Sequence, residues 1–235
     1  MKVVGIVGFK KSGKTTLGVA LAKALRDMGH RVAVIKHTHD NLDLSATDSK
    51  KYSRYAEMVA AVSGEQTEMI FQGEQGLEDL LTYTDATIVL VEGFKKERTY
   101  PRIVCLREAG EREALLKGLE ICTAGFDPDI SDYDIANPDH ILEMAGLAIE
   151  KAFKLPNLDC GNCGYESCYG LAREILGGRE TPDTCPSLDP VITLTIDGKK
   201  TALSGVTKIN LRKTVLAMLP SLKGFKRVSV EIEMP

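Results

Sequence analysis

The sequence predicts an α/β fold in which helices cover both faces of a doubly wound, mostly parallel β-sheet. From residue 1 to about residue 153, short runs rich in Val, Ile and Leu alternate with segments of helical periodicity, which is typical of such a sheet. Residues 8–15, Gly-Phe-Lys-Lys-Ser-Gly-Lys-Thr, match the phosphate-binding pattern GxxxxGK(S/T) and directly follow the apolar run at 3–7. A strand that leads through such a loop into a helix is the opening unit of a P-loop NTPase fold.

The elements of this fold can be followed in order along the chain. The first helix starts after Lys14, and Gly29 is suited to end it because glycine readily adopts the left-handed conformation. The closing helix of the predicted domain starts at Asn137 and Pro138, a cap residue followed by proline in the first turn. The apolar residues at helical spacing on one face of the first helix are Leu17, Leu21, Leu25 and Met28. Further strands are predicted at 31–35, 69–71, 86–91, 102–106 and 119–123.

Changes in composition divide the chain into three regions. Residues 1–153 form the predicted nucleotide-binding domain, and a stretch rich in Gly, Cys and Pro over 154–190 forms a second module, with the boundary near Leu155. The tail, residues 191–235, is predicted to hold a β-hairpin around Asp197-Gly198, a strong two-residue turn signal. The other elements predicted in the tail are a short helix at 211–222 and a strand at 228–232.

Composition and charge exclude several classes of protein. With 235 residues and 43% hydrophobic content, the chain can bury a sizeable core. The formal net charge of −3 shows no basic excess, so neither nucleic acid nor an anionic membrane surface is an expected partner. The longest apolar stretch, 86–91, is too short to span a bilayer, and no signal-peptide pattern precedes the first strand. We therefore expect a cytoplasmic protein.

The loop at 8–15 is the predicted nucleotide site. Gly8 and Gly13 allow the backbone to approach phosphate closely, and Lys14 can reach the β and γ phosphates as a point charge. The hydroxyl of Thr15 is expected to bind Mg²⁺. The alternative is a tight strand-to-helix turn with an exposed lysine, which would not require Lys and Thr together after the second glycine. The residues predicted to contact the nucleotide are Gly8, Lys11, Ser12, Gly13, Lys14, Thr15 and Thr16.

A second metal-binding carboxylate is expected at the end of a neighbouring strand. Glu92 directly follows the apolar strand at 86–91, at the edge where open parallel sheets bind ligands; the alternative is a solvated acid at a strand end. The polar segment 36–49 leaves the same edge and is a candidate switch loop, in which Asp40 and Asp48 are both candidates for contact with Mg²⁺. No certain catalytic base is evident. The predicted catalytic residues are Lys14, Asp48 and Glu92.

Four of the six cysteines fall within one short window and form a candidate metal site. In a reducing compartment such a cluster indicates a metal site rather than disulfides. Only the first two cysteines have the spacing of a zinc knuckle, and the last is followed by proline, a recurring context of iron–sulfur ligands. A 4Fe-4S cluster is the leading interpretation, with zinc or unligated redox-active thiols as alternatives. The predicted ligands are Cys160, Cys163, Cys168 and Cys185, whereas Cys105 and Cys122 are interpreted as small buried residues.

Two parts of the chain resemble known families. Residues 8–16, 34–39, 47–49 and 89–94 are similar to the motifs of the molybdopterin-guanine dinucleotide biosynthesis protein B family. The resemblance covers about residues 1–153, and its most specific elements are Lys-His-Thr-His and Val-Glu-Gly-Phe. The switch segment departs from the family, which usually shows His-His-Asp where this chain has His39-Asp40-Asn41. The cysteine window separately resembles the small 4Fe-4S domain of electron-transfer and corrinoid iron–sulfur proteins.

The first resemblance implies a P-loop GTPase that is usually dimeric and only weakly hydrolytic. It implies GTP and Mg²⁺ as ligands, and a molybdopterin guanylyltransferase, which joins GMP to molybdopterin, and a molybdenum or tungsten enzyme as partners. Because the chain lacks an Asn-Lys-x-Asp guanine-reading motif, the choice of GTP over ATP comes from the resemblance alone. The alternative functions are a nucleotide-dependent metal-insertion chaperone and a small-molecule kinase, although neither lid arginines nor a substrate carboxylate are apparent for a kinase.

Overall fold

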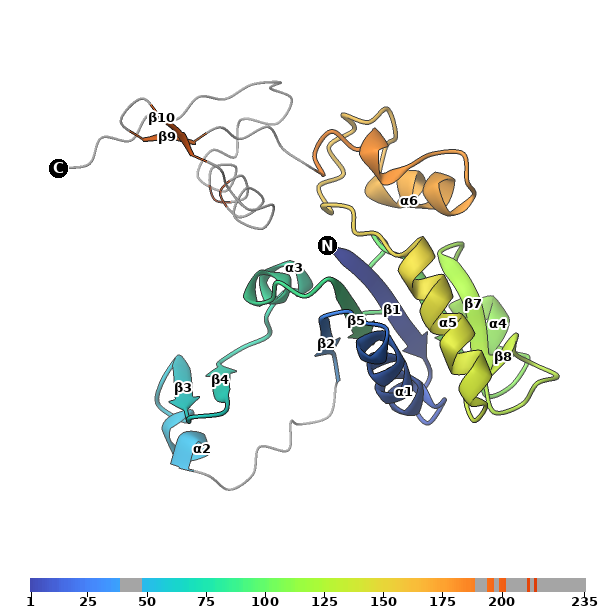
Figure 1. The fold of residues 1–235 in the computed structure, drawn as a ribbon, viewed down its shortest axis with the longest axis horizontal. Coiled ribbons are helices and arrows are strands. Elements are labelled where there is room, and N and C mark those ends of the chain that lie inside the picture. The colour runs from blue at the N-terminus through green and yellow to red at the C-terminus, as the bar shows by residue number, and fades with distance from the viewer. Residues whose placement is uncertain (39–47, 189–193, 197–198, 202–210, 212–213, 215–235) are drawn as a thin grey trace.

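The fold is centred on one parallel sheet. The computed structural model describes residues 1–38, 48–188, 194–196, 199–201, 211 and 214. Six strands follow the order β2-β5-β1-β6-β7-β8, and every neighbouring pair is parallel (Figure 1). This confirms the predicted α/β class and the doubly wound sheet. The strands are β1 (Lys2–Gly8), β2 (Val32–Lys36), β5 (Ile88–Glu92), β6 (Arg102–Cys105), β7 (Glu120–Gly125) and β8 (Tyr133–Asp134).

Helices cover both faces of the sheet because successive strand residues point to opposite faces. On one face, buried side chains of β1 and β5 contact the two long helices, α1 (Lys14–Asp27) and α5 (Pro138–Lys151). On the other face, the same strands contact α3 (Leu77–Leu80) and the 3₁₀ turn η1 (Leu81–Tyr83), and α4 (Glu111–Leu115) packs against β6. The loops that follow the central strands leave the sheet at its carboxyl edge.

The two long helices begin and end near the predicted residues. Gly29, with φ +87°, ends α1, and its N–H donates to the carbonyl oxygen of Arg26. At the start of α5, the side chain of Asn137 accepts a hydrogen bond from the N–H of Asp139 at 2.9 Å. One expectation is wrong: Met28, predicted on the buried face of α1, is exposed because it follows the last helical residue as the C-cap.

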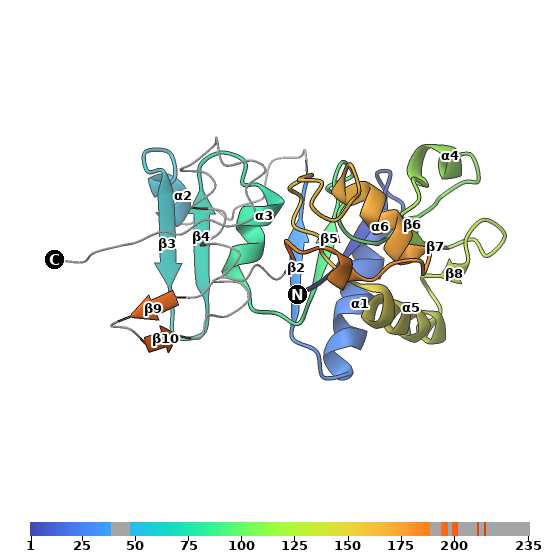
Figure 2. The ribbon, with the colours of Figure 1, turned by 90° about the horizontal axis from the view of Figure 1, so that it is seen from above.

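A separate antiparallel hairpin contains the strand that the sequence predicts at 69–71. In it β3 (Met58–Val62) pairs with β4 (Thr67–Phe71), and α2 (Asp48–Tyr52) packs against β3. Figure 2 shows this hairpin apart from the six-stranded sheet, beyond the edge strand β2. The predicted strand therefore exists but belongs to a different sheet.

The cysteine-rich segment shares a hydrophobic core with the residues around it. Leu171 and Ala172 of α6 (Cys168–Leu176) pack in one cluster with Leu119 and Phe153. The segment then continues into the 3₁₀ turn η2 (Pro182–Thr184). Because this core joins residues on both sides of position 154, the division into a domain at 1–153, a module at 154–190 and a tail at 191–235 stays a prediction.

A short hairpin is the main part of the tail that falls among the described residues. Its strands β9 (Leu194–Ile196) and β10 (Lys199–Thr201) pair antiparallel on either side of the predicted turn at 197–198. The predicted helix at 211–222, apart from residues 211 and 214, and the strand at 228–232 lie outside the described residues. Within the described ranges, no helix combines the length and the apolar character that a membrane span requires.

Candidate functional site

Two glycines shape the loop between β1 and α1. A Cβ on Gly8 would lie 2.4 Å from Ser12 Oγ and 2.6 Å from the carbonyl oxygen of Cys105. Gly13 has φ +84°, and a Cβ there would lie 2.9 Å from the ring of Phe126. Any larger residue at these positions would force the loop out of its shape.

The N-terminus of α1 is open toward this loop. Its N-cap, Gly13, offers no side chain to cap it, and no acidic residue occupies its first turn. The N–H groups of Lys14, Thr15 and Thr16 therefore have no side-chain cap, and the helix dipole favours an anion in front of them. A phosphate group has the charge and the acceptor oxygens that suit this position.

Ser12 and Lys11 of the phosphate loop differ in burial. Ser12 is buried, and its Oγ lies beneath the loop beside Gly8, without a hydrogen-bond partner in the part of the chain that the structure describes. Lys11 is exposed and has φ +63°, a left-handed conformation that is unusual for a residue with a side chain.

Lys14 is held within the loop. Its Nζ donates a hydrogen bond to the carbonyl oxygen of Phe9 at 2.6 Å. Partial burial lowers the pKa of Lys14, and the positive charges of Lys95 and Lys36 lower it further, while the charge of Glu92 acts in the opposite direction. Three ammonium groups thus lie near the loop and give it a positive field suited to phosphate.

Thr15 and Glu92 meet where β1 and β5 end side by side. The hydroxyl of Thr15 lies 3.0 Å from Glu92 Oε1 and 3.2 Å from Oε2. The parallel pairing of β1 with β5 places Glu92 beside Ile6, close to the start of the loop. Glu92 is only 8% exposed, so it is not a solvated acid at a strand end. A hydroxyl and a carboxylate oxygen are ligands that fit Mg²⁺.

Lys36 begins the Lys-His-Thr-His motif and is not among the predicted site residues, yet it contacts both members of this pair. Its Nζ lies 3.6 Å from Glu92 Oε1 and 3.5 Å from Thr15 Oγ1. β2 and β5 are in register at Lys36 and Glu92, so the two side chains leave the same face of the sheet. The contact between Lys36 and Glu92 can be predicted from the sequence only when β2 and β5 are known to be neighbouring strands.

The switch segment is described only in part. His37 follows β2, and its Nε2 lies 3.3 Å from Glu74 Oε1. Asp40 lies outside the described residues. Asp48 begins α2, which Figure 1 shows beside the hairpin rather than beside α1. The contact of Asp48 with Mg²⁺ therefore stays a prediction.

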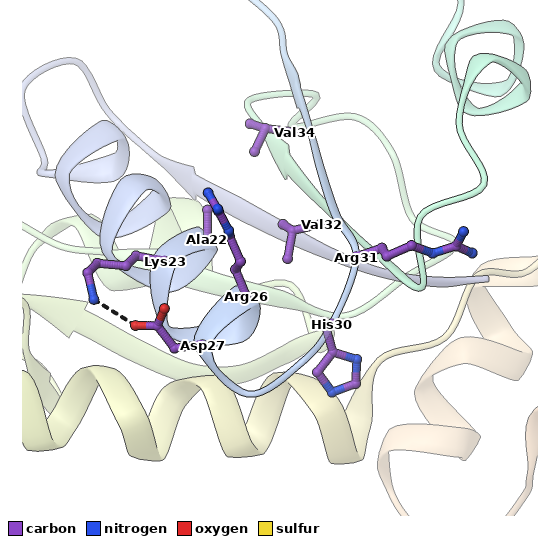
Figure 3. Close-up of a pocket in the computed structure, with 8 residues that line it drawn as sticks. All are labelled: Ala22, Lys23, Arg26, Asp27, His30, Arg31, Val32 and Val34. Carbon is purple, nitrogen blue, oxygen red and sulfur yellow. Dashed lines mark hydrogen bonds and ion pairs between the residues drawn. The ribbon is translucent and has the colours of Figure 1, made fainter.

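A pocket of about 720 Å³ lies at the opposite end of α1 from the phosphate loop (Figure 3). Its charged groups are largely engaged: Lys23 Nζ lies 2.6 Å from Asp27, and Arg31 Nη1 lies 2.9 Å from Asp85. It contains none of the predicted site residues. Its lining consists of Ala22, Lys23, Arg26, Asp27, His30, Arg31, Val32 and Val34.

The four cysteines of the window lie close to one another. Cys168 and Cys185 are buried, Cys163 is half-buried and Cys160 is exposed, and none of the four forms a disulfide. Burial raises the pKa of Cys185, and the nearness of the other three thiols raises it further. Thiolate sulfur is the soft ligand that iron–sulfur clusters and zinc require, so the donor set fits either group.

Tight turns arrange the first part of this window. Gly161 and Gly164 have φ +70° and +87°, and the N–H of Gly164 donates to the carbonyl oxygen of Gly161 at 2.9 Å. The N–H of Cys168 donates to Asp159 Oδ1 at 2.6 Å, which ties the start of α6 to these turns. Within the described ranges, no three His, Cys, Asp or Glu side chains are already grouped as ligands of one metal ion.

The loop at 93–101 contacts both candidate sites. Lys95 Nζ lies 4.5 Å from the centroid of the Phe9 ring in the phosphate loop. Farther along, the guanidinium carbon of Arg98 lies 5.0 Å from the ring centroid of Tyr169 in α6. One short segment therefore links the phosphate loop to the helix that carries Cys168.

Sequence comparison assigns the two parts of the chain separately. The family model described as molybdopterin guanine dinucleotide synthesis protein B matches residues 3–124, and one described as "Putative Fe-S cluster" matches residues 155–187. A Methanocaldococcus jannaschii protein named "Putative molybdopterin-guanine dinucleotide biosynthesis adapter protein" is 32% identical over 100% of this chain and 98% of its own length. The Escherichia coli molybdopterin-guanine dinucleotide biosynthesis adapter protein is 31% identical over 62% of this chain and 89% of its own length.

The fold has a solved counterpart as well. The crystal structure of Bacillus subtilis MobB superposes with a TM-score of 0.54 and 19% sequence identity, over 63% of this chain and 98% of that one. At this level of identity the similarity concerns the fold. The family model and the full-length relative, by contrast, rest on sequence. The chain belongs to the molybdopterin guanine dinucleotide synthesis protein B family.

Proposed function

We propose that this chain is a GTP-binding accessory protein of molybdopterin guanine dinucleotide synthesis, with weak GTPase activity and a 4Fe-4S cluster. The observation that carries the nucleotide part is the contact between Thr15 and Glu92 beside the phosphate loop. Family membership and the names of the relatives support the role in cofactor assembly. We infer GTP rather than ATP because the guanylyltransferase it would assist uses guanine nucleotide.

The loop would bind the nucleotide by positioned charge. Lys14 would exchange the carbonyl oxygen of Phe9 for oxygens of the β and γ phosphates, which the N–H groups at the start of α1 also face. The oxygens of Thr15 and Glu92 would hold Mg²⁺. When bound, Mg²⁺ neutralises charge on the phosphates.

The hydrolysis that we propose is slow. Glu92 is engaged by Thr15 and Lys36 and is therefore not free to take a proton from water. We propose Asp48 as the residue that aligns water or contacts the metal. A second copy of the chain or a partner enzyme would then raise the rate by fixing the position of Asp48.

The cysteine window would hold a 4Fe-4S cluster through Cys160, Cys163, Cys168 and Cys185. A single zinc ion draws its four sulfurs to about 2.3 Å from one point. A four-iron cluster instead takes each sulfur on a separate iron, and the family model described as "Putative Fe-S cluster" over residues 155–187 supports this choice. Zinc is the less favoured ligand for this reason.

The proposed role predicts that the chain stimulates a molybdopterin guanylyltransferase. In a purified mixture of that enzyme, molybdopterin and GTP, the chain is expected to raise the rate of dinucleotide formation several-fold. The Lys14→Ala variant serves as the control, because it should keep the fold but lose the nucleotide. Equal rates with wild type, with the variant and without either would contradict the proposed role.

A second candidate function is a nucleotide-dependent metal-insertion chaperone. It is favoured by the exposure of Cys160 and by the loop at 93–101, which contacts both the phosphate loop and α6. A chaperone should release its metal during GTP turnover, whereas an accessory protein with a resident cluster should keep it. Iron and zinc retained by the protein after many turnovers distinguish the two.

We also propose that the protein is a homodimer that associates through the β3–β4 hairpin. Because Ala60 pairs with Met69, the side chains of Met58, Val62 and Met69 leave the same face of this hairpin, and all three are exposed. Exposed apolar side chains that share one face mark a surface for protein contact. A second copy of the hairpin would bury that face.

The dimer can be tested at positions that barely affect folding. Val62→Lys combined with Met69→Lys is expected to convert a dimer to a monomer in sedimentation equilibrium, because two charges would be buried at the contact. Val19 of α1 is 68% exposed, so Val19→Lys is a matched control that should leave the dimer intact. A wild-type protein that stays monomeric at all concentrations would rule the dimer out.

A further inference from the structure

The nucleotide site already contains a cation of the protein itself. Lys36 Nζ lies 3.6 Å from Glu92 Oε1 and 3.5 Å from Thr15 Oγ1. An ionised carboxylate only accepts hydrogen bonds, so the hydroxyl of Thr15 uses its one proton on Glu92, at 3.0 Å. The lone pairs of that hydroxyl are then left for a positive group, and Lys36 supplies it.

This ammonium contacts the same oxygens that would bind a divalent cation. Mg²⁺ binds through hydroxyl and carboxylate oxygens, and two cations on the same oxygens repel each other strongly at short range. Glu92 is 8% exposed, so a positive group beside it compensates a charge that is largely removed from water. In this structure Lys36 supplies that positive charge beside Glu92.

The side chain of Lys36 is much less buried than that of Glu92. The side chain of Lys36 is 50% exposed, whereas that of Glu92 is 10% exposed. Lys36 is the last residue of β2, so its four-carbon stem can turn at the carboxyl edge of the sheet without a change in strand pairing. Lys36 is near enough to Lys14 to lower its pKa, which places its charge beside the phosphate loop as well as beside Glu92.

We propose that Lys36 is a built-in substitute for the divalent cation, which Mg²⁺ displaces when nucleotide binds and which then contacts the terminal phosphate of a triphosphate. This inference rests on the proposed nucleotide function and adds a residue that selects among nucleotides. A diphosphate has no γ-phosphate for the displaced ammonium to contact, so the Lys36–Glu92 contact that metal binding breaks is not replaced by another. Lys36 therefore favours the triphosphate over the diphosphate.

Lys36→Met tests both proposed effects of Lys36, competition with the metal and contact with the triphosphate. It keeps most of the side-chain stem and removes the charge. Mn²⁺ binding in the presence of GDP, followed by electron paramagnetic resonance, is expected to become about tenfold tighter, since the competing cation is gone. Binding of a non-hydrolysable GTP analogue is expected to become about tenfold weaker, since a charge-assisted contact is lost. The variant thus acts in opposite directions on the two complexes.

The control is Lys23→Met, on the same long helix as Lys14 but ion-paired with Asp27 and remote from the loop. It is expected to change neither measurement. If Lys36→Met weakened both complexes by the same factor, Lys36 would add only general positive charge and the inference would be overturned. No change in either complex would overturn it as well.

A failure of the proposed function can be told apart from a failure of this inference. If wild-type protein bound neither nucleotide, the proposed function would fail on its own. Lys36→Met, Glu92→Gln and the double variant would then be compared by thermal unfolding of the nucleotide-free protein. Non-additive changes in Tm would support Lys36 as the cation beside Glu92, and additive changes would overturn it.

Discussion

Lys14→Ala is expected to abolish nucleotide binding, with an affinity loss of about a hundredfold or more. The variant removes the ammonium group that Phe9 now holds inside the loop, at the position from which it would contact the β and γ phosphates. A hydrogen bond to a charged group contributes about 1.5–3 kcal/mol, and each 1.4 kcal/mol is about tenfold in affinity. Isothermal titration with GTP and Mg²⁺ measures the loss directly.

The fold should survive this substitution. Burial lowers the pKa of Lys14, so the charge of Lys14 is disfavoured in the folded state and its removal is expected to cost little stability. The matched control is Lys23→Ala, on the exposed face of the same helix. Wild-type-like GTP affinity in a folded Lys14→Ala protein would exclude the phosphate loop as the nucleotide site.

The second large effect is expected from Cys185→Ser, which should remove the iron–sulfur cluster. Cys185 is 5% exposed and lies in the same buried cluster as Cys168 and Leu171, so its sulfur cannot be replaced by water or by a surface thiol. Protein prepared without oxygen should contain iron and sulfide in equal amounts, together with the broad visible absorption of such clusters. In the variant both should fall to background.

Cys122→Ala is the control for this measurement. Cys122 is buried in the core between the sheet and the helices, where burial raises its pKa to about 12, and it is outside the cysteine window. Its substitution should leave the iron and sulfide content unchanged while slightly lowering the Tm. Stoichiometric zinc without iron in the wild-type protein would exclude the cluster.

Much of the fold can be predicted from local patterns in the sequence. The buried strand before Glu92, the cap at Asn137 and the glycine that ends α1 each depend on residues within one element. Such signals are complete in the sequence because the forces that produce them act between near neighbours. The same holds for the two glycines of the phosphate loop.

Features that depend on strand order could not be predicted in this way. Lys36 meets Glu92 only because β5 lies between β1 and β2, an order that no local pattern records. The strand predicted at 69–71 gave no sign that it pairs with β3 rather than with the sheet. The burial of Leu119 against α6 likewise joins residues far apart in the chain.

The shared core around α6 also determines how this protein can be divided for experiments. A chain cut after residue 153 would uncover Leu119 and Phe153, which Leu171 and Ala172 now cover. Such a fragment would expose an apolar surface that the undivided protein buries. It would self-associate through this surface, and that association would be mistaken for native assembly. The isolated cysteine segment would lose the same contacts from the other side. The two candidate sites can be interpreted only in the undivided protein.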